Sequence, residues 1–145
     1  MKNYLMTFLI LSVLFGAAGI IQAEEPFVRI STVEKSFKLG TFSFWEDGTS
    51  SSVLTVKVES NCLHGPVVAS ISSLKRAGSV SITPDRVMVK TETTGGYVSM
   101  ATPVAISETT NGSHDIKMNF KIKTNITDRA GRYSGVLAFT VMPPS

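Results

Sequence analysis

Residues 115–123 read DIKMNFKIK, a stretch in which polar and apolar side chains alternate at every position. This period of two is typical of a β-strand with one face in the core and the other in water. The apolar positions are Ile116, Met118, Phe120 and Ile122. They are expected to face the core, so the segment predicts an antiparallel sheet with one solvated face.

Shorter runs of β-branched and aromatic residues recur about every ten residues along the rest of the chain, separated by clusters of Gly, Pro, Asn, Asp and Ser. A tight turn is predicted at 46–49, because Asp-Gly tolerates the positive φ of a hairpin. No stretch has the pattern of an amphipathic helix. The predicted strands are 27–33 or 27–37, 41–45, 53–58, 67–72, 80–83, 87–90, 97–100, 103–106, 115–123 and 133–141.

Short strands at this spacing, with no helices to make parallel crossovers, predict an all-β fold. The expected architecture is an antiparallel immunoglobulin-like β-sandwich of about seven to nine strands. A small closed β-barrel is the alternative, since the same alternation suits both. In the last strand the residues expected on the core side are Tyr133, Leu137, Phe139 and Val141.

The first 23 residues have the composition of a secretory signal peptide, which combines a basic start, an apolar run and small residues before the cleavage site. Lys2 precedes an uncharged apolar run over 5–14, and Ala23 is the last residue before Glu24. Cleavage would leave 24–145 as a single domain. We therefore expect an exported protein, located in the periplasm, outside the cell or on the cell surface. An uncleaved membrane anchor is the disfavoured alternative, since the run is shorter than the ~20 residues of a span.

The charges argue against nucleic acid as a partner. Fourteen basic and 11 acidic residues give a formal net charge of +3, which falls to +2 without Lys2. Lys75 and Arg76 are the only adjacent basic pair, so the polybasic stripe that nucleic acid or an anionic membrane requires is missing. No stable membrane insertion is expected after cleavage, because the longest later apolar runs are only a few residues.

Cys62 is the only cysteine, so no disulfide can form within the chain. It is either a small buried hydrophobe or an exposed thiol that pairs with another chain. Cys62 and His64 have the chemistry of soft-metal ligands, but a structural zinc site takes four ligands and the chain offers two His and one Cys. We expect loop residues here, and neither a metal site nor a cofactor.

The chain is not expected to be an enzyme. His114 stands beside Asp115, but no nucleophile motif accompanies this pair, so a solvated strand start is the preferred interpretation. Trp45 and its acidic neighbours offer a second kind of site, a platform for sugar stacking or protein binding. Core packing by Phe42 and Phe44, with Trp45 covering a sheet edge or loop, is preferred. No catalytic residue is assigned.

Residues 128–141, DRAGRYSGVLAFTV, resemble the final strand of bacterial immunoglobulin-like envelope domains, in particular fimbrial-subunit-like and spore-coat-U-like secreted proteins. In these proteins a Gly turn leads into a Tyr and then into an alternating strand. Gly131 matches the turn, and the Tyr133 ring is expected at the end of the sandwich with its hydroxyl free to meet backbone. The resemblance implies a surface subunit. The paired cysteines of many such subunits do not carry over to the lone Cys62.

Two interpretations of 24–37 remain open. Val28, Ile30 and Thr32 alternate as they would in an N-terminal extension donated to a neighbouring subunit. The same residues also suit the first strand of a self-contained sandwich. The self-contained strand is preferred, because an ordinary edge strand needs no partner and the final strand appears complete within this chain.

These patterns predict a secreted, non-enzymatic structural or interaction protein of the bacterial cell envelope. It would associate with itself or with protein partners through exposed edge strands, as a fimbrial-like subunit does. The alternative is a monomeric carbohydrate- or protein-binding module that uses Trp45 and the polar loops. The candidate interaction residues are Val28, Ile30, Trp45, Cys62 and Leu137.

Overall fold

The strand predicted from residues 115–123 is β12 (His114–Ile122), the longest strand of the larger sheet. The computed structural model describes residues 24–43, 47–50, 52–77 and 81–141. The predicted signal peptide and Trp45 lie outside these residues. Ile116, Met118 and Phe120 are all buried, so the predicted core face of this strand is confirmed.

The larger sheet has the order β1–β3–β12–β8–β9, and β2 pairs with the end of β12. Every pairing in it is antiparallel. The strand bounds are β1 (Val28–Thr32), β2 (Gly48–Thr49), β3 (Leu54–Ser60), β8 (Val87–Lys90) and β9 (Val98–Ser99).

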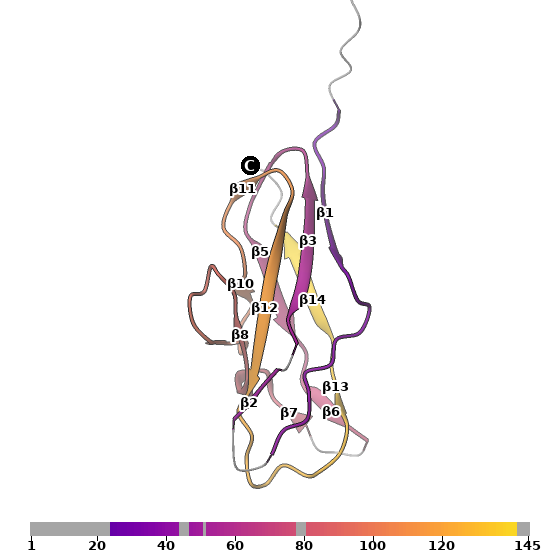
Figure 1. Cartoon of the computed structure of the whole chain (residues 1–145), viewed down its shortest axis with the longest axis vertical. Helices are drawn as coiled ribbons and strands as arrows, with labels where there is room; N and C mark the ends of the chain where they lie inside the picture. Colours follow the sequence, from indigo (N-terminus) through magenta and orange to yellow (C-terminus); the bar gives the residue numbers. More distant parts are fainter. Residues whose placement is uncertain (1–23, 44–46, 51, 78–80, 142–145) are drawn as a thin grey trace, which may run out of the picture.

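A smaller antiparallel sheet has the order β10–β5–β14 and forms the second layer (Figure 1). Its strands are β10 (Val104–Ala105), β5 (Val67–Ile71) and β14 (Leu137–Val141). Short pairings extend the two ends of the molecule, β4 with β11 at one end and β13–β6–β7 at the other. These strands are β4 (Leu63–His64), β6 (Leu74–Arg76), β7 (Ser81–Ile82), β11 (Thr110–Asn111) and β13 (Tyr133–Ser134), and a 3₁₀ turn, η1 (Pro84–Arg86), precedes β8.

The core lies between the two layers. Its members are apolar residues at alternate strand positions, which is how two antiparallel sheets bury their inner faces. The most completely buried side chains include Phe120, Met100, Ile106, Met118, Val56, Val58, Val67, Val87 and Val89. The described residues close no barrel, so the predicted antiparallel β-sandwich is confirmed and the barrel alternative is not.

Two local predictions near Gly48 are wrong. Residues 41–43 form no strand, and Gly48 lies in β2 rather than in a positive-φ turn. The ring of Phe42 occupies the place where a Cβ on Gly48 would lie. Glycine is therefore required at position 48 by close packing against an aromatic ring.

The predicted last strand, 133–141, is divided in two. Tyr133 pairs with β6, whereas β14 begins at Leu137 and pairs with β5 in a different sheet. A Cβ on Gly135 would meet the side chain of Leu74, so glycine allows the chain to pass closely between the sheets. The Tyr133 hydroxyl donates a hydrogen bond to the Arg129 carbonyl at 2.8 Å, which confirms its predicted contact with backbone. A hydrogen bond from a Tyr hydroxyl to backbone a few residues upstream also characterises the tyrosine corner of immunoglobulin-like sandwiches.

Candidate functional site

The candidate site is the side of the sandwich where β1 and β14 lie next to each other, which we call the open side (Figure 1). β1 is an edge of the larger sheet, and β14 is an edge of the smaller one. Their Cα atoms come within 8 Å, yet the two strands belong to different sheets and do not pair with each other. In the described part of the chain, two unpaired strand edges therefore meet on this side.

Side chains on the open side face the core but are only half-buried. Each packs against the buried cluster, and each lies at an alternate position of its strand. They are Val28 and Ile30 on β1, and Leu137, Phe139 and Val141 on β14. An inner face that stays partly exposed loses part of the stabilisation that complete burial gives, about 25 cal/mol for each Å² of apolar surface.

Along β14, the residues whose side chains face the core are also those whose backbone groups do not bond to β5. Ser72 N–H donates to the Val136 carbonyl at 2.9 Å, and Val136 N–H donates to the Ser72 hydroxyl at 2.9 Å. Hydrogen-bonded and non-hydrogen-bonded pairs alternate in an antiparallel ladder. Ala138 and Thr140 thus bond to β5, and the N–H and C=O groups of the residues between them point toward the open side.

The opposite edge of β5 supports this phase. Val67, the register partner of Val141, gives its carbonyl to Ile106 N–H at 2.8 Å and its N–H to the Ser107 hydroxyl at 3.1 Å. Both backbone groups of Val67 are therefore directed to the β10 side. The peptide groups of Val141 face the other way, toward β1.

β1 repeats the arrangement. Phe27 and Asn61 are joined by two hydrogen bonds, from Asn61 N–H to the Phe27 carbonyl at 3.4 Å and from Phe27 N–H to Asn61 Oδ1 at 2.8 Å. Counting from this pair, Arg29 and Ser31 bond to β3. The peptide groups of Val28, Ile30 and Thr32 point away from β3.

On both strands, therefore, the same residues direct side chains into the core and peptide groups to the open side. An extended segment placed there would pair with a strand edge through backbone hydrogen bonds. Every second side chain of that segment would cover the half-buried inner faces. This is the chemistry of β-strand addition, in which the backbone supplies affinity and the alternate side chains supply specificity.

Three of the sequence-predicted interaction residues lie on the open side. Val28 and Ile30 are on β1, and Leu137 is on β14. Val28 pairs with Ser60 and Leu137 with Ile71, which places them at opposite ends of the side. Phe139 and Val141 were predicted as core residues and missed as interaction residues. The alternation that identified Leu137 identifies them equally.

Cys62 lies at the end of the molecule where β1 begins. Its side chain is half-buried, and its Sγ lies 3.6 Å from both the Phe27 carbonyl and the Ser60 hydroxyl. The thiol thus matches neither sequence-based alternative fully. It is close to the open side through Phe27, which directly precedes β1.

His64 was expected to be a loop residue, and that expectation is wrong. His114 is the first residue of β12, as expected, but it is half-buried rather than solvated. His64 lies in β4 and is fully buried, and its ring stacks on that of His114 with centroids 5.4 Å apart and planes within 5°. His64 Nδ1 donates to the Gly65 carbonyl at 2.8 Å, and its Nε2 is buried. Nε2 of His114 is also buried, and no group of the described residues bonds to either atom. Within the described ranges, no three His, Cys, Asp or Glu side chains are grouped closely enough to hold a metal ion.

A bidentate ion pair joins Arg86 of η1 to Asp128, and no sequence pattern indicated it because the two residues are 42 positions apart. The hydrogen bonds and charge of Arg86 hold the pKa of the Asp128 carboxyl below its ordinary value, and Asn125 N–H adds to this effect. The hydrogen bonds to Asp128 raise the pKa of Arg86 in turn. Arg86 Nε also donates to the Lys123 carbonyl at 2.9 Å. The pair therefore fixes the 123–132 connection to the start of β8.

Comparison with protein-family models, with curated proteins and with solved structures gives no match to this chain. In the part of the chain that the structure describes, no helix has the length and apolar character needed to cross a membrane.

Proposed function

We propose that this protein is an exported, non-enzymatic subunit of a bacterial envelope assembly, and that copies associate by adding an extended strand to the open side. One observation carries the proposal. On β1 and β14, the residues whose half-buried side chains face the core are also the residues whose peptide groups point away from the neighbouring strand, toward the open side. Export rests on the signal-peptide pattern of residues 1–23. The resemblance of residues 128–141 to fimbrial-like domains supports the envelope assignment.

The occupant of the open side must satisfy two requirements. It must be extended, so that its peptide groups match the strand edge. It must also carry apolar residues at alternate positions, because the surfaces it meets are those of Ile30, Phe139 and Val141. Long, exposed, apolar strand edges otherwise promote uncontrolled pairing, so a matched partner also protects the protein from aggregation.

The test is the molar mass of exported mature protein, measured by light scattering after size exclusion over a range of concentrations. Wild type is expected to form multimers that persist with reductant. Phe139→Asp is expected to be monomeric, because it places a charge where the incoming strand packs. Thr140→Asp is the matched control, since Thr140 is its neighbour, is exposed and faces away from the core.

Hydrogen exchange makes the test independent of whether the variants fold. The amides of Leu137, Phe139 and Val141 should become protected when wild-type monomers assemble, whereas those of Ala138 and Thr140 should be protected in both states. A wild type that stays monomeric at all concentrations would overturn the proposal. So would multimers in which the alternate amides of β14 exchange as fast as in the monomer.

The carbohydrate-binding alternative depends on Trp45. That residue lies outside the described part of the chain, so no geometry in the structure supports a second proposed function.

A further inference from the structure

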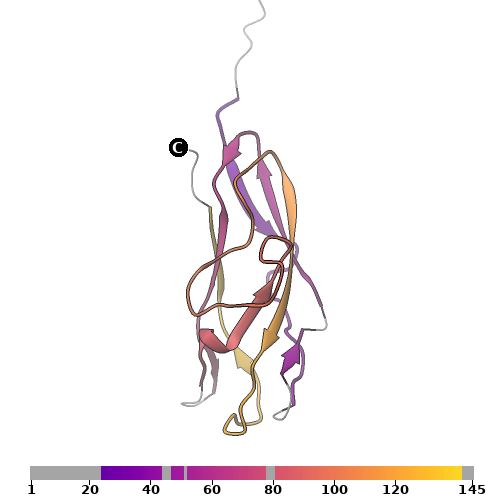
Figure 2. The ribbon, with the colours of Figure 1, turned by 90° about the vertical axis from the view of Figure 1, so that its left-hand side faces the viewer.

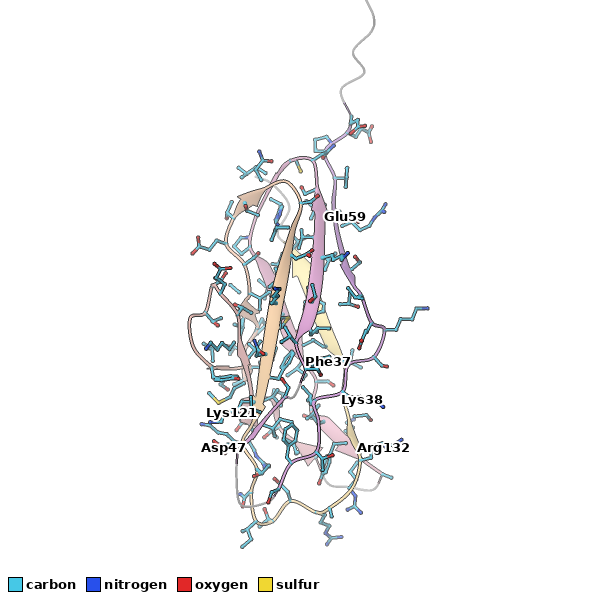
Figure 3. All side chains as sticks on the ribbon, in the orientation of Figure 1. Phe37, Lys38, Asp47, Glu59, Lys121 and Arg132 are labelled. Atoms are coloured by element: carbon cyan, nitrogen blue, oxygen red, sulfur yellow. The ribbon has the colours of Figure 1, made fainter. Side chains whose placement is uncertain are left out.

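The two ends of the long axis carry opposite charges. One end contains residues 24–29, 59–66 and 107–115, and we call it the acidic end. The other contains 74–77, 84–86 and 123–134, and we call it the basic end. Figure 3 shows Glu59 and Arg132 near these opposite ends.

Sequence and pairing fix these two groups independently of the view. β4 pairs with β11, and Phe27 N–H donates to Asn61 Oδ1, so the three segments of the acidic end meet. At the basic end β6 pairs with β13, and Arg86 bonds to both Lys123 and Asp128. Each end is thus one continuous surface built from three stretches of chain.

Among the described residues the acidic end has five acidic side chains and one basic one. They are Glu24, Glu25, Glu59, Glu108, Asp115 and Arg29, and all are exposed. Arg29 lies 3.9 Å from Glu59, and Asp115 stands opposite Lys57 in the β3–β12 register. Glu24, Glu25 and Glu108 remain as excess negative charge. Cleavage after Ala23 would add one α-amino group at this end and leave it acidic.

The basic end has six basic and two acidic side chains among its described residues. They are Lys75, Arg76, Arg86, Lys123, Arg129, Arg132, Asp85 and Asp128. Arg86 and Asp128 neutralise each other in their ion pair. Lys75, Lys123, Arg129 and Arg132 are exposed, so this end presents several positive charges to solvent.

We infer that the partner of the basic end is the acidic end of a second copy, so that successive copies associate head to tail. The inference deepens the proposed function and rests on it. Two like ends repel each other, whereas unlike ends attract. A contact between two different surfaces of the same chain leaves one free end of each kind, so it repeats, and it forms an open filament when the rotation between copies does not close a ring.

The free energies expected for exposed ion pairs and for strand addition indicate different roles for the two ends and for the open side. An exposed ion pair contributes about 0–1 kcal/mol and is screened by salt. Complementary charges act mainly on orientation and on the rate of encounter. Head-to-tail charge therefore selects the polarity of the assembly, while strand addition at the open side holds it together.

The experiment reverses one end, the other end, or both. Lys123→Glu with Arg129→Glu and Arg132→Glu makes both ends acidic, because the basic end then has three basic and five acidic side chains. Glu24→Arg with Glu25→Arg and Glu108→Arg makes both ends basic, because the acidic end then has four basic and two acidic side chains. Each of these chains alone should assemble at least about tenfold more slowly than wild type at low salt. A mixture of the two should recover the rate, and so should the single chain that carries all six substitutions. Lys35→Glu with Lys90→Glu and Lys117→Glu, outside the segments of both ends, is the control for net charge.

The readout is the growth of light scattering after dilution from denaturant into low and high salt. Recovery in the mixture and in the sixfold variant supports the inference, because only charge complementarity predicts both. Half-reversed chains that assemble at the wild-type rate overturn it and leave strand addition intact. A wild type that never assembles overturns the proposed function itself. Normal assembly combined with lost retention on an anionic polymer column would instead assign the basic end to such a polymer.

Discussion

The side of the sandwich that carries β9 and β10 contrasts with the open side. There the chain passes directly from the larger sheet to the smaller one, as seen from that side in Figure 2. Met100, Val104 and Ile106 lie on this passage and are buried. We call this the closed side. On the open side, Ile30 and Phe139 remain half-buried, although both are as apolar as their counterparts.

The difference teaches that burial here depends on chain connection as much as on residue type. At the closed side, the segment that connects β9 to β10 covers the edges of both sheets. At the open side β1 and β14 are distant in sequence, and neither is covered by a connecting segment of the described chain. Apolar residues at an uncovered edge contribute less to folding and are available to a partner.

The largest expected effect measures this difference directly. Phe120→Ala should lower the free energy of unfolding by about 3–5 kcal/mol, because the ring is 1% exposed and leaves a cavity. Phe139→Ala should cost about 2 kcal/mol in the monomer, since part of that ring is already solvated. Denaturant unfolding of the monomeric protein gives both values. Equal costs would mean that the open side is as well packed as the core, and the comparison would fail.

The second effect concerns the ion pair beside the closed side. Asp128→Asn should lower the free energy of unfolding at pH 7 by about 2 kcal/mol, because Arg86 loses its charged hydrogen-bond partner. The side chains of Arg86 and Asp128 are only 21% and 9% exposed, so solvent screens them weakly. Arg86→Lys is the conservative comparison. It should lower the free energy of unfolding by less than Asp128→Asn does, because the positive charge stays and only the bidentate geometry is lost.

The same pair predicts a pH dependence with a definite sign. Because Arg86 lowers the pKa of Asp128 in the folded protein, the pair stabilises the fold at pH values above the ordinary carboxyl range, about pH 4. This stabilisation is lost as the pH falls through the folded-state pKa of Asp128. The difference in the free energy of unfolding between wild type and Asp128→Asn should therefore shrink as the pH falls below the ordinary carboxyl range, about pH 4. A constant gap would contradict the assignment.

A smaller effect is expected at the C-terminal end of β12, where β2 pairs. Gly48→Ala should cost about 1–3 kcal/mol, because the new Cβ overlaps the Phe42 ring. Gly48→Ala with Phe42→Leu should recover much of this loss by making room for the methyl group. Thermal unfolding compares the three proteins. If the single variant is as stable as wild type, Phe42 does not pack as described.

The fold was predictable where the pattern is local. Alternation over 115–123 identified the core face of β12, and alternation over 53–58 predicted the strand β3, because a half-buried strand imposes a period of two. The division of 133–141 was not predictable, since alternation continues through the point where the chain changes sheets. That change depends on Ser72 and Leu74, which lie far away in the sequence. The same holds for Gly48, whose role depends on Phe42.

The site was predictable only as a set of strands. The pattern selected Val28, Ile30 and Leu137, but their place at an edge follows from strand order, which long-range pairing decides. The His64–His114 stack shows the same limit, because its members are 50 residues apart and each looked solvated in its own segment. The local alternation of the sequence predicts which face of a strand a residue is on, whereas the order of the strands in the sheets decides how exposed that residue is.

The smallest expected effect asks what holds β1 on the open side. Arg29 and Glu59 are register partners across β1 and β3, with side chains that are 74% and 53% exposed. A pair this exposed contributes little, so Glu59→Gln should change the free energy of unfolding by less than about 0.5 kcal/mol at any salt concentration. Ile30→Ala, from the neighbouring position, should cost more because it removes packing against the core. A loss above about 1 kcal/mol for Glu59→Gln that disappears in high salt would show that charge, rather than backbone pairing and packing, attaches β1 to the sheet.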